Sequence, residues 1–328
     1  MTFYNVTNPV MPTVLPTWLT SSSVIYFRGD NRFDHDLTLA STGLISNFGE
    51  TGSRITVTSG SFNVTNAVGI NLNLYNNLGI IGNITVTNGI TITNASSLII
   101  AGTLISGTTN TGAKTITTTS GGITLSGAVI SGGELTLHSA GTITQAAGTG
   151  LTITGGKLNL SAGGAINLTS GVNRIGTVGL WNSGSSIAVT NETQLSLSGG
   201  LVAGAGGSII ITVNNNAGLK VVSGTFSSSG GRVILNLGKG VYDNLNGAAN
   251  TTPGYGWDTE NNDLTLNAGG MSYGNSTIFS VGTGKFRTNL VFTNLFASKH
   301  VYINDTGVFS AADQQRFTDL NSDAIFRS

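Results

Sequence analysis

The sequence predicts an all-β fold, a right-handed parallel β-helix (β-solenoid) with atypical terminal caps, and three observations support this prediction. Apolar and polar residues alternate in short bursts, such as Ile-Thr-Ile-Thr at residues 90–93 and Leu-Asn-Leu-Ser at residues 158–161, as in half-buried strands. Glycine or asparagine closes the bursts, which permits tight corners. Large side chains are scarce, since Trp181 is the only aromatic residue from Gly79 to Thr225. A narrow coil filled by stacked aliphatic side chains has these properties.

The apolar members of the bursts define the expected core. Successive side chains of a strand point to opposite faces, so the aliphatic residues share one face and Thr, Ser or Asn the other. Branched residues, which suit a pleated and half-buried surface, dominate the bursts. The side chains that we expect to point inward in stacked ladders are Ile123, Leu125, Leu135, Leu137, Ile143, Leu151, Ile153, Leu158, Leu160, Ile166 and Leu168.

An antiparallel β-sandwich that serves as a binding module is the alternative architecture, because it also has short strands separated by turns. The bursts here span three to five residues, which is shorter than most sandwich strands. A sandwich also needs large side chains to fill the gap of about 10 Å between its sheets. Strand pairing distinguishes the two architectures, since the solenoid requires parallel pairs between successive coils.

Composition divides the chain into three segments. Residues 1–36 contain three of the four prolines, and because proline marks sheet edges we expect an amino-terminal arm or cap. Residues 37–240 carry the regular bursts, and we expect a β-helix core with roughly 20–25 residues in each turn. Residues 241–328 contain twelve aromatic residues, and we expect wider coils, a cap or an assembly segment there.

The composition also excludes several functional classes. The 14 basic residues balance the 14 acidic ones, so no basic face is available for nucleic acid. No apolar run reaches the roughly 18 residues that a membrane-spanning helix needs. The chain has no cysteine, which excludes disulfides, thiolate metal sites and cysteine nucleophiles.

One stretch of the chain has a more specific pattern. Gly141–Gln145 reads G-T-I-T-Q, Leu158–Leu168 reads L-N-L-S-A-G-G-A-I-N-L, and Asn173–Val178 reads N-R-I-G-T-V. In this order the three pieces resemble the repeats of filamentous-haemagglutinin-type exoproteins, the large adhesins of two-partner secretion systems. A looser likeness covers about residues 84–270. The resemblance implies a right-handed parallel β-helix, export, a surface or adhesive role, and no catalytic residues.

Two clusters near the amino terminus are candidates for recognition or metal binding. Arg28, Gly29 and Asp30 spell the integrin-binding Arg-Gly-Asp tripeptide, and a turn with glycine at positive φ is the structural interpretation of the same residues. The sequence Asp-His-Asp at residues 34–36 is the only histidine–carboxylate cluster. In a strand its two carboxylates would share one face while the imidazole points away, so we expect a solvated turn.

A third cluster lies in the aromatic-rich segment. Asp258, Glu260 and Asp263 form a loose set of oxygen ligands and are weak candidates for calcium binding. Their spacing lacks the glycine and the distal glutamate of an EF-hand loop. Apart from these residues, we expect no metal or cofactor site in the chain.

The predicted function is that of an extracellular or cell-surface protein, a structural or adhesive β-solenoid subunit that associates end to end with copies of itself. Host or cell-surface glycans are further candidate partners. The alternative is a carbohydrate-processing β-helix enzyme, such as a phage-type depolymerase or polysaccharide lyase. Such enzymes need paired carboxylates or a carboxylate beside a basic residue, whereas Glu134 and Glu192 are isolated in the sequence. We therefore predict no catalytic residues and no enzymatic activity.

Overall fold

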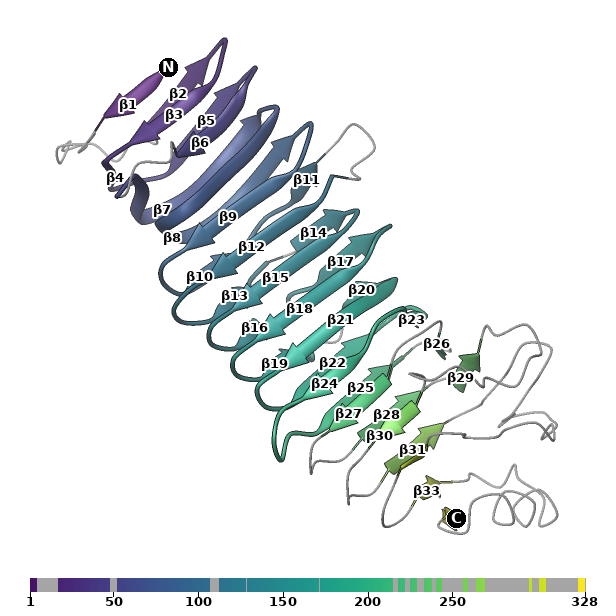
Figure 1. Cartoon of the computed structure of the whole chain (residues 1–328). Coiled ribbons are helices and arrows are strands. Elements are labelled where there is room, and N and C mark those ends of the chain that lie inside the picture. The colour runs from purple at the N-terminus through teal and green to yellow at the C-terminus, as the bar shows by residue number, and fades with distance from the viewer. Residues whose placement is uncertain are drawn as a thin grey trace. The chain divides into compact units, whose positions relative to one another are not determined.

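The structure, a computed structural model, describes two compact units, Met1–Gly163 and Gly164–Ser328. In the first 214 residues it describes all but residues 5–16, 48–51, 107–111, 128 and 171. Beyond residue 214 it describes only the backbone of the strands given below. The described residues contain strands and no helix, and parallel pairing builds a β-solenoid in each unit (Figure 1). The predicted parallel β-solenoid is therefore confirmed, and the antiparallel sandwich is excluded.

The described part of the first unit contains eighteen strands. Their bounds are β1 (Thr2–Tyr4), β2 (Thr17–Ser21), β3 (Ile25–Arg28), β4 (Asp30–Phe33), β5 (Leu37–Ser41), β6 (Leu44–Asn47), β7 (Arg54–Asn66), β8 (Gly69–Val86), β9 (Ile90–Asn94), β10 (Leu98–Ile100), β11 (Leu104–Ser106), β12 (Lys114–Thr118), β13 (Ile123–Leu125), β14 (Val129–Gly132), β15 (Leu135–Ser139), β16 (Ile143–Gln145), β17 (Leu151–Thr154) and β18 (Leu158–Ala162). Strands β2, β3 and β4 show that the described part of the predicted amino-terminal segment contributes ladder strands to the solenoid.

Three strands form each regular coil of this unit. Strands β12, β13 and β14 of one coil pair in parallel with β15, β16 and β17 of the next. Ladder partners along one side are Ile45, Ile70, Ile90, Lys114, Leu135 and Leu158. Successive partners are separated by 25, 20, 24, 21 and 23 residues. These separations agree with the coil length predicted from the sequence.

The core consists of the aliphatic side chains that alternation assigned to the inner face. All eleven predicted inward residues are buried, with at most 3% of each exposed. Near the amino terminus the core also contains aromatic side chains. The ring of Phe3 on β1 stacks on Phe27 with centroids 5.3 Å apart, and Phe27 meets the edge of Phe33 at 6.3 Å. Aromatic side chains thus share this part of the core with aliphatic ones such as Ile25.

Buried asparagines fix one row of corners. The Asn47 amide nitrogen donates to Asn76 Oδ1 at 3.0 Å, and the same oxygen accepts from the backbone N–H of Ile55 at 2.9 Å. The Asn76 amide nitrogen donates to the carbonyl of Thr93 at 3.0 Å. One coil further, Asn94 Oδ1 accepts from the N–H of Leu78 at 2.7 Å. The side chains therefore satisfy backbone groups that the corners leave outside the ladders.

The second unit repeats the same construction in its described strands. Their bounds are β19 (Ile166–Leu168), β20 (Arg174–Ile175), β21 (Thr177–Ser183), β22 (Ile187–Asn191), β23 (Leu195–Leu197), β24 (Leu201–Ala203), β25 (Ile209–Val213), β26 (Gly218–Val221), β27 (Thr225–Ser228), β28 (Val233–Leu237), β29 (Gly240–Asp243), β30 (Gly256–Asp258), β31 (Leu264–Ala268), β32 (Leu295–Phe296), β33 (Val301–Asn304) and β34 (Ala324–Arg327). Trp181 on β21 is fully buried. The corner asparagines recur, since Asn191 Oδ1 accepts from the N–H of Ile175 at 2.8 Å.

Coil length changes along this unit. The ladder partners Ile187, Ile209 and Val233 are separated by 22 and 24 residues. The next steps, from Val233 to Leu264 and from Leu264 to Val301, span 31 and 37 residues. The longer steps lie in the segment where the aromatic content rises.

Candidate functional site

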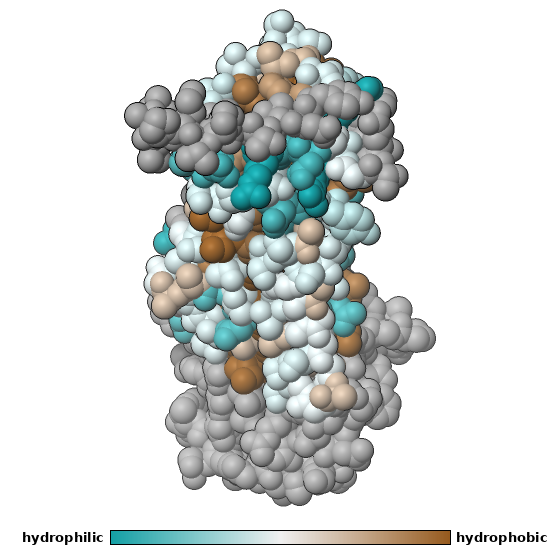
Figure 2. All heavy atoms as spheres, turned by 90° about the vertical axis from the view of Figure 1, so that its left-hand side faces the viewer, coloured by the Kyte–Doolittle hydropathy of each residue, from teal (hydrophilic) through white to brown (hydrophobic). Residues whose placement is uncertain are grey.

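Charged side chains concentrate in one region of the first unit. Seven of the 28 charged residues of the chain lie between Arg28 and Arg54, whereas five lie in the much longer range 55–213. On the face shown in Figure 2, which is the left-hand side of Figure 1 where β4 lies, strongly hydrophilic side chains gather near the amino-terminal end. The candidate site for polar recognition is therefore the corner between β3 and β4 and the coil below it.

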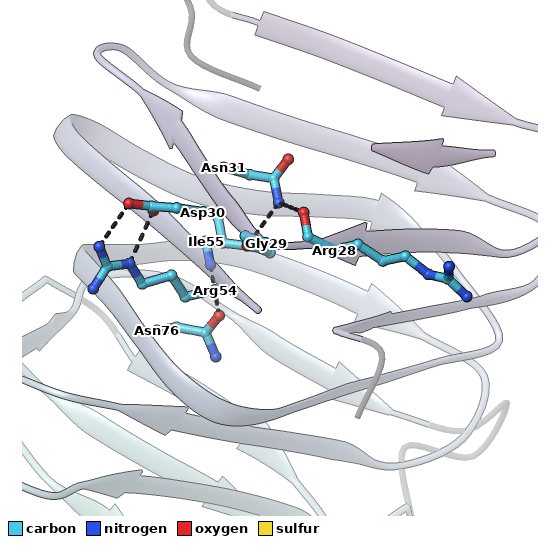
Figure 3. A network of polar contacts seen from close by, with 7 residues as sticks. All are labelled: Arg28, Gly29, Asp30, Asn31, Arg54, Ile55 and Asn76. Carbon is cyan, nitrogen blue, oxygen red and sulfur yellow. Dashed lines mark hydrogen bonds and ion pairs between the residues drawn. The ribbon is translucent and has the colours of Figure 1, made fainter. Parts of the chain in front are cut away.

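The Arg-Gly-Asp tripeptide forms this corner. Arg28 ends β3, Asp30 begins β4, and Gly29 between them has a φ of 64°, a conformation that side chains disfavour. The side chains of Arg28 and Asp30 extend in opposite directions (Figure 3). The buried Asn31 holds the corner from inside, donating to the carbonyls of Arg28 at 2.9 Å and Gly29 at 3.2 Å. The glycine turn expected from the sequence is thus present.

Asp30 forms a two-point ion pair with Arg54 of the next coil. Arg54 Nε donates to Asp30 Oδ1 at 2.9 Å, and Nη2 donates to Oδ2 at 2.6 Å (Figure 3). The hydrogen bonds from Arg54 lower the pKa of the Asp30 carboxyl, and Asp30 raises the pKa of the Arg54 guanidinium. Both oxygens of the tripeptide carboxylate are therefore engaged within the protein. A receptor that uses this carboxylate must displace Arg54 or bind the pair together.

The Asp-His-Asp cluster lies at the following corner, between β4 and β5. Thr58 donates to Asp34 Oδ1 at 2.8 Å, and Arg32 Nε donates to the same oxygen at 3.4 Å. These contacts lower the pKa of the Asp34 carboxyl, with the Thr58 hydrogen bond the largest cause. Asp36 Oδ1 accepts from the backbone N–H of Ser61 at 2.6 Å. Asp34 and Asp36 thus each accept a hydrogen bond from a residue of the next coil.

Lys114 is the one fully buried ionisable side chain in the part of the chain described with side chains. It occupies an inward position of β12 between Ile90 and Leu135 in the ladder. Its ammonium group donates to the carbonyl of Gly112 at 3.0 Å and to that of Gly132. Burial lowers the pKa of Lys114 to about 8. The alternating sequence Lys-Thr-Ile-Thr could have revealed this position, because residue 114 shares a face with residue 116.

The acidic residues in the middle of the chain are engaged by neighbouring coils. Glu134 Oε1 accepts from Asn159 Nδ2 at 2.7 Å in the first unit, and Glu192 Oε1 accepts from Asn214 Nδ2 at 3.4 Å in the second. Among the described residues no three His, Asp or Glu side chains are grouped so as to hold a metal ion. Of the calcium candidates, Asp258 ends β30, whereas Glu260 and Asp263 lie outside the described residues.

A neutral depression lies on a different side of the first unit, beside the ends of β2 and β5. It has a volume of about 210 Å³ and is lined by Thr20, Ser21, Ser22, Ala40, Ser41, Thr42 and Asn66. None of the lining residues is charged. Trp18, which is 60% exposed, lies two residues before Thr20 on the same strand. The site has no local signature in the sequence, because its parts come from three successive coils.

No protein-family model, curated protein or solved structure matches this chain. The resemblance of residues 141–178 to filamentous-haemagglutinin-type repeats therefore stays a prediction. In the part of the chain that the structure describes, no helix is long and apolar enough to cross a membrane.

Proposed function

We propose that this protein is an extracellular structural or adhesive β-solenoid that presents neutral surfaces and associates end to end. The observation that carries this proposal is the outer face of the first unit. Along one side of the coils, the residues that lie in register at a single outward position are Asn71, Thr91, Thr115, Thr136 and Asn159. Such a row offers hydroxyl and amide groups without charge. It suits a scaffold or a contact surface better than acid–base chemistry.

The amino-terminal edge of the solenoid supports self-association. Among the described residues β1 pairs with β3 alone, β2 with β5 alone and β4 with β7 alone. Each of the three strands therefore has a second edge without a strand partner in this part of the chain. Unpaired strand edges promote addition of further strands, and another copy of the chain supplies parallel strands at the same spacing.

Light scattering and negative-stain microscopy of the purified full chain test this proposal. We expect rods or filaments whose mass exceeds the 33.4 kDa of one chain, and we expect deletion of residues 1–20 to reduce their length. A monodisperse monomer at high concentration, unchanged by the deletion, would refute end-to-end association.

We also propose that the protein has no enzymatic activity on polysaccharides. Glu134 and Glu192 each accept a hydrogen bond from an asparagine amide of the next coil, and this structural role of the two carboxylates supports the proposal. The test is an assay for reducing ends and unsaturated products on a panel of glycans. Product release that disappears in Glu134→Gln or Glu192→Gln would instead favour the enzyme alternative.

A further inference from the structure

An exposed tryptophan marks the depression beside β2 as a candidate ligand site. Trp18 is 60% exposed, whereas Trp181 on β21 is fully buried. Trp18 and Thr20 lie on the same outward face of β2, two residues apart, and this spacing is about 6.6 Å along a strand. In register beside them on β5 are Thr38 and Ala40. A flat aromatic surface thus adjoins the depression without a bulky side chain between them.

The inner hydroxyls of the depression hold its shape. Ser21 Oγ accepts from the backbone N–H of Ser23 at 3.2 Å. Ser41 Oγ donates to the carbonyl of Ser23 and accepts from the N–H of Gly43 at 3.0 Å. The N–H of Thr42 donates to the carbonyl of Ser21 at 3.1 Å. These bonds join two coils at a fixed distance, so the depression is formed before any ligand binds.

The outer polar groups of the depression remain available. Thr20, Ser22, Thr42 and Asn66 are exposed, and their side chains make no hydrogen bond to other residues in the described part of the chain. Three hydroxyls and one amide, each able to donate and accept, therefore face solvent around a space of about 210 Å³. This volume is below the roughly 300–1,000 Å³ of pockets for drug-sized molecules. It suits one ring of a longer ligand.

We propose that this surface, Trp18 with the depression lined by Thr20, Ser22, Thr42 and Asn66, binds one or more sugar residues of a neutral, extended glycan. An aromatic plane covers the apolar face of a pyranose ring, and hydroxyl and amide groups pair with its equatorial hydroxyls. The absence of lining charges disfavours an anionic glycan, whose sulfates or carboxylates require basic partners. The inference rests on the proposed adhesive function and specifies its ligand.

The spacing of the coils favours an extended rather than a compact glycan chain. The lining residues come from three successive coils, represented by Ser22, Thr42 and Asn66. Adjacent strands lie about 4.8 Å apart, which is close to the length of one sugar residue in an extended β-linked chain. A glycan that runs across the coils can therefore meet a polar side chain at each step.

Isothermal titration calorimetry on the full chain tests the proposal, with cellohexaose and β-1,4-mannohexaose as extended probes and maltohexaose as a compact one. We expect the extended probes to bind more tightly. Trp18→Ala should weaken binding at least about fivefold, as truncation of an aromatic contact does, and Trp18→Phe should weaken it less. Thr42→Val, which keeps the shape but removes a hydroxyl, should also weaken it.

Tyr75→Ala is the matched control, because Tyr75 is also exposed, at 66%, but does not line the depression. It should bind like the unchanged protein, and all variants should melt at the same temperature. The proposal is overturned if no neutral probe binds, if Trp18→Ala binds equally well, or if heparin alone binds. Light scattering of the same samples separates the two hypotheses: Trp18→Ala should lose glycan binding while keeping its assembly state. An unchanged protein that binds the extended probes as a monodisperse monomer would instead contradict only the end-to-end association.

Discussion

The ion pair between Asp30 and Arg54 is the strongest charged contact of the Arg-Gly-Asp corner, yet about half of each side chain is exposed. Exposed pairs contribute little, so we expect Asp30→Asn to lower the free energy of unfolding by about 0.5–1 kcal/mol at pH 6. The pKa of Asp30 is lowered in the folded state. Its contribution is therefore present above the ordinary carboxyl pKa of 3.8 and is lost as the pH falls through the lowered value.

Urea unfolding of the unchanged protein and of Asp30→Asn, each at pH 6 and pH 2, measures this effect. The difference between them should be present at pH 6 and smaller at pH 2, because protonation of Asp30 removes it as the pH falls below 3.8. A double-mutant cycle with Arg54→Gln assigns the difference to the pair. If Asp30→Asn lowers the free energy of unfolding by the same amount at both pH values, the carboxylate charge is not what stabilises this corner.

The stability contributed by Lys114 also rises with pH, but for a different reason, because its charged form is the one that the fold disfavours. Its pKa falls from 10.5 to about 8 on burial. Between these values the unfolded chain binds more protons than the folded chain, so stability rises with pH from about 8 to 10.5. In Lys114→Met this contribution is absent.

The measurement is the urea midpoint of both proteins from pH 7 to pH 10.5. Relative to Lys114→Met, the unchanged protein should gain stability across this range. Other groups titrate in both proteins and cancel in the difference. A difference that is constant with pH would show that the ammonium group titrates normally, for example because water reaches it.

At the scale of elements, the corner asparagines determine where one strand ends and the next begins. Asn76 contacts Asn47, Ile55 and Thr93 through its side chain, and it is fully buried. Asn76→Ala leaves several buried backbone groups unpaired, so we expect a loss of about 2 kcal/mol or more in unfolding free energy. Asn88→Ala, at an exposed corner, is the control and should change stability by less than about 0.5 kcal/mol. Equal effects in the two variants, measured by urea unfolding, would contradict a stabilising role for the asparagine row.

Strand positions were predictable from the sequence because each strand of a solenoid repeats one simple pattern. Alternation alone assigned Leu160 and Ile143 to the inner face, and both are buried. The same rule applied to Ile116 places Lys114 inward, although a lysine is rarely fully buried. The corner role of Asn94 is visible only as an asparagine that ends a burst of alternation.

The contacts between coils were harder to predict, because they depend on register. Asp30 and Arg54 are 24 residues apart, and Glu134 and Asn159 are 25 apart. Both separations equal one coil, so a search for complementary side chains at this distance would have found them. The exact number varies from 20 to 25 with the length of each corner, and no local pattern specifies that variation. The depression beside Trp18 was missed for the same reason.

At the scale of the whole molecule, each terminal strand of a β-solenoid has one edge without a neighbouring strand, where backbone N–H and C=O groups are unpaired. Backbone groups of a parallel strand alternate in direction, so that one residue faces one neighbour and the next residue faces the other. The N–H of Tyr26 donates to the carbonyl of Met1 at 2.8 Å. Met1 and Phe3 therefore face β3, and the backbone N–H of Thr2 faces the opposite edge of β1.

If copies of the chain associate through this edge, Thr2→Pro should weaken the association, because proline removes the N–H of residue 2 without breaking the β1–β3 ladder. The loss of one backbone hydrogen bond corresponds to about 1 kcal/mol, or roughly a fivefold higher dissociation constant in sedimentation or light scattering. Thr2→Val keeps the N–H and a similar side-chain shape, so it should associate like the unchanged protein. Both variants should melt normally, since the aromatic stacking of Phe3 on Phe27 is untouched. Equal association of Thr2→Pro and Thr2→Val would show that the edge of β1 is not the contact between copies.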